Sequence, residues 1–139
     1  MLKQVHEHIV SELQQNARTD TLFVVTAIAF NLIVLGINSA VAAEAESART
    51  NSSNDLILAV FIVMSLLVNG IAIIALNTGR KSREKLLQGL LTMYLDNDVA
   101  KYYDASLVEG YGKRYLLFTG VILCLALTSI LVPLIIRFL

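Results

Sequence analysis

Residues 115–139, YLLFTGVILCLALTSILVPLIIRFL, form an almost entirely apolar stretch whose only charged residue is Arg137. About 20 consecutive apolar residues in a helix, each rising about 1.5 Å, match the ~30 Å hydrocarbon core of a bilayer. No soluble domain of this size needs such a helix. The stretch therefore predicts a transmembrane helix and an all-α integral membrane protein.

The composition supports this class. Of 139 residues, 56% are hydrophobic and the mean hydropathy is +0.68, whereas soluble domains are about 45–50% apolar. The single cysteine, Cys124, excludes an internal disulfide. The formal net charge is zero, so nothing in the composition suggests a nucleic-acid partner.

Two further apolar runs, residues 22–43 and 56–76, predict a first and a second span, joined by a short polar loop at 44–55. The first run is too long for a cleaved signal peptide, and some twenty mostly polar residues precede it, so we expect it to be retained. Residues 1–139 are then a single membrane domain with three spans.

The charge distribution predicts the orientation. Nine of the eleven Lys and Arg residues precede the first span or lie in the 77–114 connection, and cytoplasmic loops are rich in such residues. We expect a cytoplasmic N-terminus and an external C-terminus, as three spans require. Because no organelle-targeting segment is visible, the expected location is the plasma membrane of a prokaryote.

Outside the spans, helical periodicity predicts amphipathic helices at residues 2–18 and, as a cytosolic hairpin, within 82–109. Thr19-Asp20-Thr21 is expected to cap the first span. Gly79 is expected to close the second span, and Gly110 and Gly112 the last amphipathic helix. The hairpin's apolar faces, on either side of a turn at 96–98, are Leu86, Leu87, Leu90 and Tyr94, then Val99, Tyr102, Tyr103 and Leu107.

Four polar side chains fall inside the first two spans: Asn31, Asn38, Ser65 and Asn69. An unpaired amide in lipid costs several kcal/mol, so these groups need hydrogen-bond partners or water. They could bond between helices. Alternatively, Asn31 and Asn38 from several copies could line an uncharged polar pore, with Glu44 and Glu46 as an acidic ring at its outer mouth.

Small residues predict helix-packing faces, because they let two backbones approach closely. Such faces occur on the first span, opposite its asparagines, and on the third. A chain with more packing faces than internal neighbours is expected to form a homo-oligomer. The residues concerned are Ala29, Gly36, Ala40, Gly120, Cys124 and Thr128.

Motifs for other chemistry fail on spacing. His6 and His8 are two residues apart and point to different sides of a helix, so they chelate poorly. The 96–98 segment starts like a calcium loop but lacks the glycine and the final glutamate. Cys124 has no histidine or carboxylate in the same apolar run to activate it as a nucleophile.

Two other patterns have simpler explanations than a specific function. Asn51 begins an N-glycosylation triplet, a pattern that is common by chance. The basic cluster from Arg80 to Lys85 could attract anionic lipid, although topology alone accounts for it.

The sequence therefore predicts a protein that is not an enzyme and has no catalytic residue, cofactor or metal. We expect a small oligomeric membrane protein acting as an ion or solute channel with an uncharged polar lining. The alternative is a non-transporting scaffold or subunit that docks a partner through its cytosolic amphipathic helices. The expected partners are membrane lipid and, at the cytosolic face, a protein.

Overall fold

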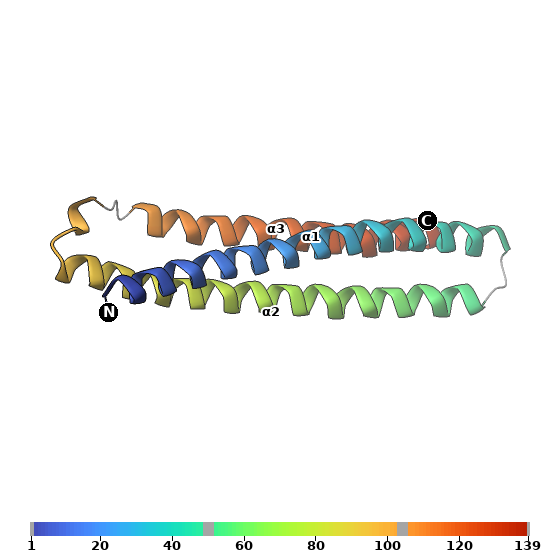
Figure 1. The fold of residues 1–139 in the computed structure, drawn as a ribbon. Coiled ribbons are helices and arrows are strands. Elements are labelled where there is room, and N and C mark those ends of the chain that lie inside the picture. Colours follow the sequence, from blue (N-terminus) through green and yellow to red (C-terminus); the bar gives the residue numbers. More distant parts are fainter. Residues whose placement is uncertain (1, 49–51, 103–105, 139) are drawn as a thin grey trace.

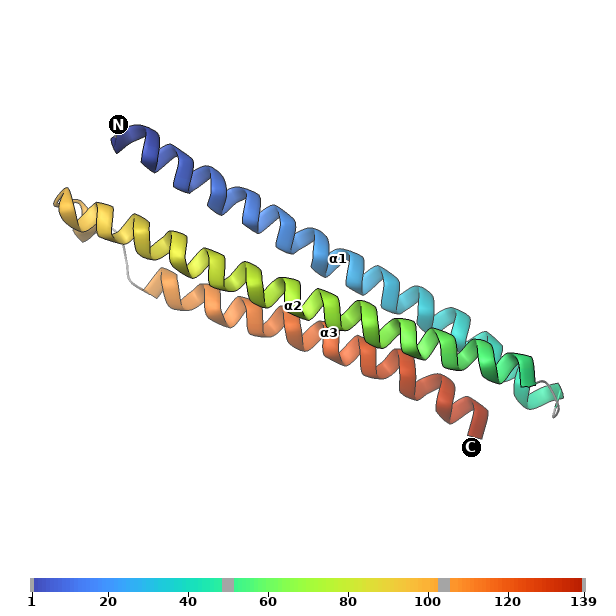
Figure 2. The same ribbon diagram turned by 90° about the horizontal axis from the view of Figure 1, so that it is seen from below.

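The structure, a computed structural model, describes residues 2–48, 52–102 and 106–138. It is all-helical, with α1 (Leu2–Ala48), α2 (Ser52–Asp96), the short 3-10 helix η1 (Ala100–Tyr102) and α3 (Ser106–Phe138). The three long helices run side by side along one axis (Figure 1 and Figure 2). All three are long and apolar enough to cross a membrane, as the sequence predicts, and fit a multi-pass membrane protein.

The helices are in register along the bundle. Side-chain hydrogen bonds join Asn31 of α1 to Asn69 of α2 and to Ser129 of α3, so the three apolar runs lie at the same level. The apolar core next to this level consists of Val24, Ala27, Ala72, Leu76, Tyr115 and Ile122. Helices α1 and α3 are parallel to one another and antiparallel to α2 (Figure 1).

Both α1 and α2 are much longer than a bilayer is thick. Their 47 and 45 residues correspond to about 70 Å each, against a ~30 Å hydrocarbon core. The excess lies at one end, where residues 2–20 of α1 run beside residues 80–96 of α2 (Figure 1). We call this pair of segments the stalk.

The predicted breaks between amphipathic helices and spans are wrong. Helix α1 passes through Thr19-Asp20-Thr21, where the Thr19 and Thr21 hydroxyls donate to the carbonyls of Gln15 and Ala17 at 3.0 and 2.9 Å instead of capping. Helix α2 passes through Gly79. An internal glycine costs a helix only about 1 kcal/mol, whereas a break leaves several backbone groups unpaired.

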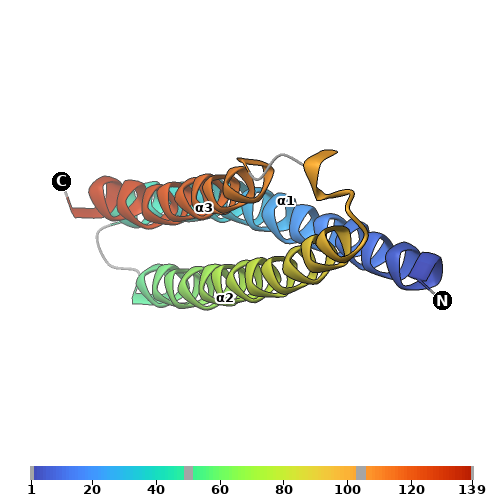
Figure 3. The same ribbon diagram turned by 90° about the vertical axis from the view of Figure 1, so that its left-hand side faces the viewer.

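The same correction applies to the predicted cytosolic hairpin. Its first segment is the end of α2, and Gly110 and Gly112 lie inside α3, which begins at Ser106 and continues through Pro133. The short helix η1 lies between the end of α2 and the start of α3 (Figure 3). Tyr103 lies outside the described residues, and so does the side chain of Leu107.

The predicted turn at 96–98 is confirmed. Helix α2 ends at Asp96, and the amides of Asp98 and Val99 donate to the carbonyls of Leu95 and Tyr94 at 3.2 and 3.0 Å. This pair of bonds is the Schellman motif, which needs a left-handed residue after the helix. Here that residue is Asp98, with φ of 56°.

Replacing Asp98 by glycine is expected to stabilise the fold by about 1 kcal/mol, because a left-handed backbone costs an L-residue roughly that amount and glycine nothing. The thermal midpoint of the purified protein in detergent should rise for Asp98→Gly. The β-branched Asp98→Val should lower it. A lower midpoint for the glycine variant would contradict the left-handed turn.

Candidate functional site

The polar residues of the first two predicted spans meet inside the bundle. Asn31 Nδ2 donates to Asn69 Oδ1 at 2.7 Å, and Asn69 Nδ2 donates back to Asn31 Oδ1 at 2.9 Å. Each amide also donates a hydrogen bond to a backbone carbonyl of its own helix: Asn31 to Ala27 at 2.9 Å and Asn69 to Ser65 at 2.7 Å. Each side-chain amide thus uses both of its donors.

Two serine hydroxyls, one from α2 and one from α3, complete this cluster. Ser65 and Ser129 lie 3.3 Å apart at their Oγ atoms, and Ser129 Oγ also lies 3.4 Å from Asn31 Oδ1. Asn31, Asn69, Ser65 and Ser129 are all buried, with at most 4% of their surface exposed. The geometry is that of interhelical hydrogen bonding within one chain, one of the two roles anticipated for Asn31, Ser65 and Asn69.

Asn38, one heptad after Asn31, is also fully buried within the chain. Among the described residues, neither atom of its side-chain amide has a hydrogen-bond partner. The stripe predicted from the spacing of the two asparagines therefore faces the bundle interior, but only Asn31 is paired.

The small residues predicted to form helix-packing faces point out of the bundle. Ala29, Gly36 and Ala40 are exposed on α1, and Gly120 and Cys124 are exposed on α3. An added Cβ at Gly36 or Gly120 would meet nothing within 4 Å. Thr128 donates to the Cys124 carbonyl at 2.9 Å within its own helix. These faces thus point out of the bundle, and the internal face of α3 consists of Tyr115, Ile122, Ala126, Ser129 and Pro133.

At the far end from the stalk, Arg137 of α3 forms two hydrogen bonds with the Asp55 carboxylate of α2, 2.8 and 3.1 Å long. Glu44 is exposed near this end, while the side chain of Glu46 lies outside those the structure describes, as does Asn51. The acidic ring remains a prediction.

A second buried polar cluster, which the sequence did not reveal, lies where the stalk joins the apolar part of the bundle. Asp20, 5% exposed, accepts a hydrogen bond from the Tyr115 hydroxyl. Asp20 also lies against Gly79, where an added Cβ would overlap its carboxylate. Asn16 Nδ2 donates to the Gly79 carbonyl at 2.9 Å. The cluster joins all three helices at this level.

Arginine side chains surround this second cluster. Arg83 is buried and donates from Nη2 to the Leu13 carbonyl at 3.1 Å, with its guanidinium 5.0 Å from the Tyr111 ring centre. Arg114 lies 5.3 Å from the Phe118 ring centre. With Asp20 and Tyr115, the two arginines line a cavity of about 20 Å³, which has room for one water molecule.

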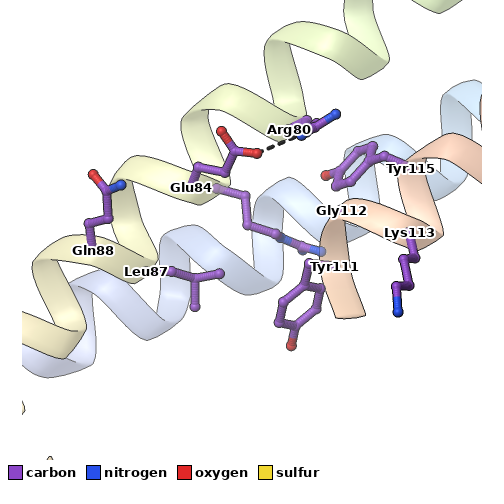
Figure 4. A pocket seen from close by; sticks show the side chains of 9 residues that line it. Arg80, Glu84, Leu87, Gln88, Tyr111, Gly112, Lys113 and Tyr115 are labelled. Carbon is purple, nitrogen blue, oxygen red and sulfur yellow. Dashed lines mark hydrogen bonds and ion pairs between the residues drawn. The ribbon is translucent and has the colours of Figure 1, made fainter. Parts of the chain in front are cut away.

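Beside this cluster, a cleft of about 460 Å³ opens between α2 and α3 (Figure 4). Arg80 and Glu84 project from α2 and are joined at 2.8 Å between Nε and Oε1, while Tyr111 and Lys113 come from the first turns of α3. The lining residues are Arg80, Arg83, Glu84, Leu87, Gln88, Tyr111, Gly112, Lys113 and Tyr115. Positive charge is thus in excess here.

The stalk ends in an apolar tip. Leu2 and Val5 of α1 are 54% and 47% exposed, and Leu95 and Tyr102 are 66% and 80% exposed. His6 Nε2 lies 3.1 Å from the Tyr94 hydroxyl and links the two helices there. A groove of about 290 Å³ between them is lined by Leu2, Lys3, His6, Met93, Tyr94, Asn97 and Val99.

Comparison of the chain with protein-family models, with curated proteins and with solved structures gives no significant match.

The reciprocal amide pair gives a quantitative prediction. Replacing Asn31 or Asn69 by leucine leaves the other amide unpaired in an apolar interior, and each change should destabilise the protein by about 1–2 kcal/mol. The double variant should cost less than the two single variants together. Reversible unfolding in mixed micelles measures these values.

Asn38→Leu is the matched control for that cycle, because it is the same substitution at a buried site with no hydrogen bond to lose. Its stability should be unchanged or higher. Strictly additive effects of Asn31→Leu and Asn69→Leu would contradict the pairing.

Gly79→Ala should destabilise the protein by about 1–3 kcal/mol, because the added methyl group forces the Asp20 carboxylate from its place between helices. Gly89→Ala, in the same helix with open space around it, should be neutral or stabilising by up to about 1 kcal/mol. Thermal unfolding in detergent compares the two. Equal effects of both substitutions would rule out close packing at Gly79.

Proposed function

We propose that the protein is a non-enzymatic, multi-pass membrane protein that holds a protein partner at the tip of its stalk. The observation that carries this proposal is the apolar tip. The stalk lies beyond the apolar part of the bundle, in water if the three helices span a membrane, yet Leu95 and Tyr102 are more than half exposed. A cluster of exposed apolar side chains on a water-exposed element is typical of an interaction site.

The shape of the tip indicates the kind of partner. Helix α3 begins only at Ser106, about two turns past the start of α1 in the register set by Asn31–Ser129 and Asp20–Tyr115. The last turns of the α1–α2 pair therefore have no third long helix among the described residues. The groove between Leu2 and Val99 lies there. An amphipathic helix of the partner would fill this position and extend the three-helix packing.

The channel is the second candidate. A pore lined by Asn31 and Asn38 requires these side chains to face an axis shared by several copies, whereas both are buried inside one chain. The exposed surface at the level of these residues is largely apolar, as at Leu32, Ile33 and Ile71. A polar path would require the helices to repack, whereas docking at the tip requires no change in the helix packing.

The orientation follows the charge distribution: the stalk is proposed to be cytoplasmic, in the plasma membrane of a prokaryote. Self-association is proposed through the outward small-residue faces on α1 and α3, and is compatible with docking because those faces lie away from the tip.

The test uses the full-length protein purified from its native membrane. Leu2→Glu places a charge in the groove at the apolar tip and should remove a stoichiometric partner without lowering the thermal midpoint, because Leu2 lines the groove and is 54% exposed. Gln14→Glu, on an exposed stalk position, should retain the partner. The ratio of partner to bait is measured by quantitative mass spectrometry, and an unchanged ratio for Leu2→Glu would refute docking at the tip.

Ion flux into liposomes separates docking from the channel. The docking function predicts no flux above that of empty liposomes. Flux that changes with Asn38→Leu would instead support the pore.

A further inference from the structure

The cleft between α2 and α3 has the composition of an anion site. Arg80, Arg83 and Lys113 line it together with a single carboxylate, Glu84, which is paired with Arg80 at 2.8 Å. Figure 4 shows Arg80 and Glu84 on one wall, with Tyr111 and Lys113 on the other. A ligand with negative charge would find uncompensated cations on both walls.

Arg83 provides an independent indication. Its side chain is only 7% exposed, and its Nε has no hydrogen-bond partner among the described residues. A buried charged donor without an acceptor is costly, and real proteins satisfy such groups. The fork of an arginine matches the oxygens of a phosphate group in geometry and charge.

The cleft continues into an apolar groove. A second hollow of about 290 Å³ shares Arg80 and Tyr115 with the cleft and extends along α2 and α3 toward the apolar part of the bundle. Its wall includes the apolar side chains of Ile73, Ile74 and Leu116. A ligand that occupies both hollows has a phosphate at one end and a hydrocarbon chain at the other.

The level of the two hollows agrees with a membrane interface. The cleft begins at Arg80, four residues past the apolar run 56–76, and at Tyr115, the first residue of the run 115–139. The groove lies beside those runs. In a bilayer, lipid headgroups occupy the first level and acyl chains the second. A phospholipid standing in its own leaflet would therefore meet the cleft with its phosphate and the groove with its chain.

We infer that the cleft and groove together bind one anionic phospholipid, whose phosphate contacts Arg80, Arg83 and Lys113 and whose acyl chain lies along Ile73, Ile74 and Leu116. The proposed site uses only two of the four cations in the basic cluster from Arg80 to Lys85, namely Arg80 and Arg83. Lys81 and Lys85 belong to that cluster but are exposed and do not line the cleft.

The experiment measures lipid retention by the full-length protein, purified in detergent and mixed with phosphatidylglycerol or phosphatidylcholine. Native mass spectrometry should show one phosphatidylglycerol bound and little phosphatidylcholine. The variant Arg80→Gln/Lys113→Gln should bind phosphatidylglycerol at least about tenfold more weakly, since each cation near a membrane surface contributes appreciably.

Lys81→Gln/Lys85→Gln removes the same charge from the same region and should bind like the wild type. Equal weakening by the two double variants would reduce the site to diffuse attraction and overturn the inference, and so would a wild type that retains no phosphatidylglycerol. Thermal midpoints without lipid show whether each variant is folded, which both should be because all four side chains are exposed.

Inorganic phosphate and water-soluble glycerophosphate distinguish a lipid from a free anion. If the groove holds the acyl chain, neither should raise the thermal midpoint as phosphatidylglycerol does, and Leu116→Gln should weaken lipid retention. An equal rise with inorganic phosphate, or unchanged retention by Leu116→Gln, would overturn the lipid as ligand.

Discussion

Water cannot meet the hydrogen-bonding demand of a side-chain amide in the apolar interior of this bundle, so another side chain must do so. The reciprocal pair of Asn31 and Asn69 meets this demand with two bonds of 2.7 and 2.9 Å. Because each amide needs the other, α1 and α2 can slide little past one another, and Ser129 ties α3 to the same level. From this one register follow the Asp20–Tyr115 bond at one end of the apolar runs and the Asp55–Arg137 pair at the other.

Burying the polar groups within a single chain determines what the outside can do. Exposed positions at mid-bundle, such as Leu32, Ile71 and Leu127, are apolar and need no protein neighbour in lipid. Specific chemistry is left to the two ends. The stalk end carries most of the polar and charged groups that could bind a ligand or a partner: a buried carboxylate, a cationic cleft and an apolar tip lie there within a few helical turns.

The sequence predicted three apolar helices, the turn at 96–98 and the shared face of Asn31 and Asn38, because these depend on local composition and helical period. The predicted helix ends at Asp20 and Gly79 were wrong, because both helices continue through these residues. Asp20 and Gly79 are residues typical of caps, but whether a helix stops there depends on a contact between α1 and α2, some sixty residues apart. The small residues Ala29 and Gly36 face outward because the paired amides direct the other side of α1 inward, and their role in helix packing stays a prediction. The cleft is made by residues of two helices and has no linear signature.

The unbroken course of α1 and α2 through the base of the stalk has a mechanical consequence. A helix interrupted at Asp20 would let the stalk swivel independently of the apolar part of the bundle, whereas a continuous helix makes the two parts tilt together. Helices bend gently over such lengths and kink mainly at proline, glycine–serine pairs or bulges. The stalk therefore acts as a lever. A sideways force on the tip would produce a torque at Asp20 and Gly79, where all three helices are in contact.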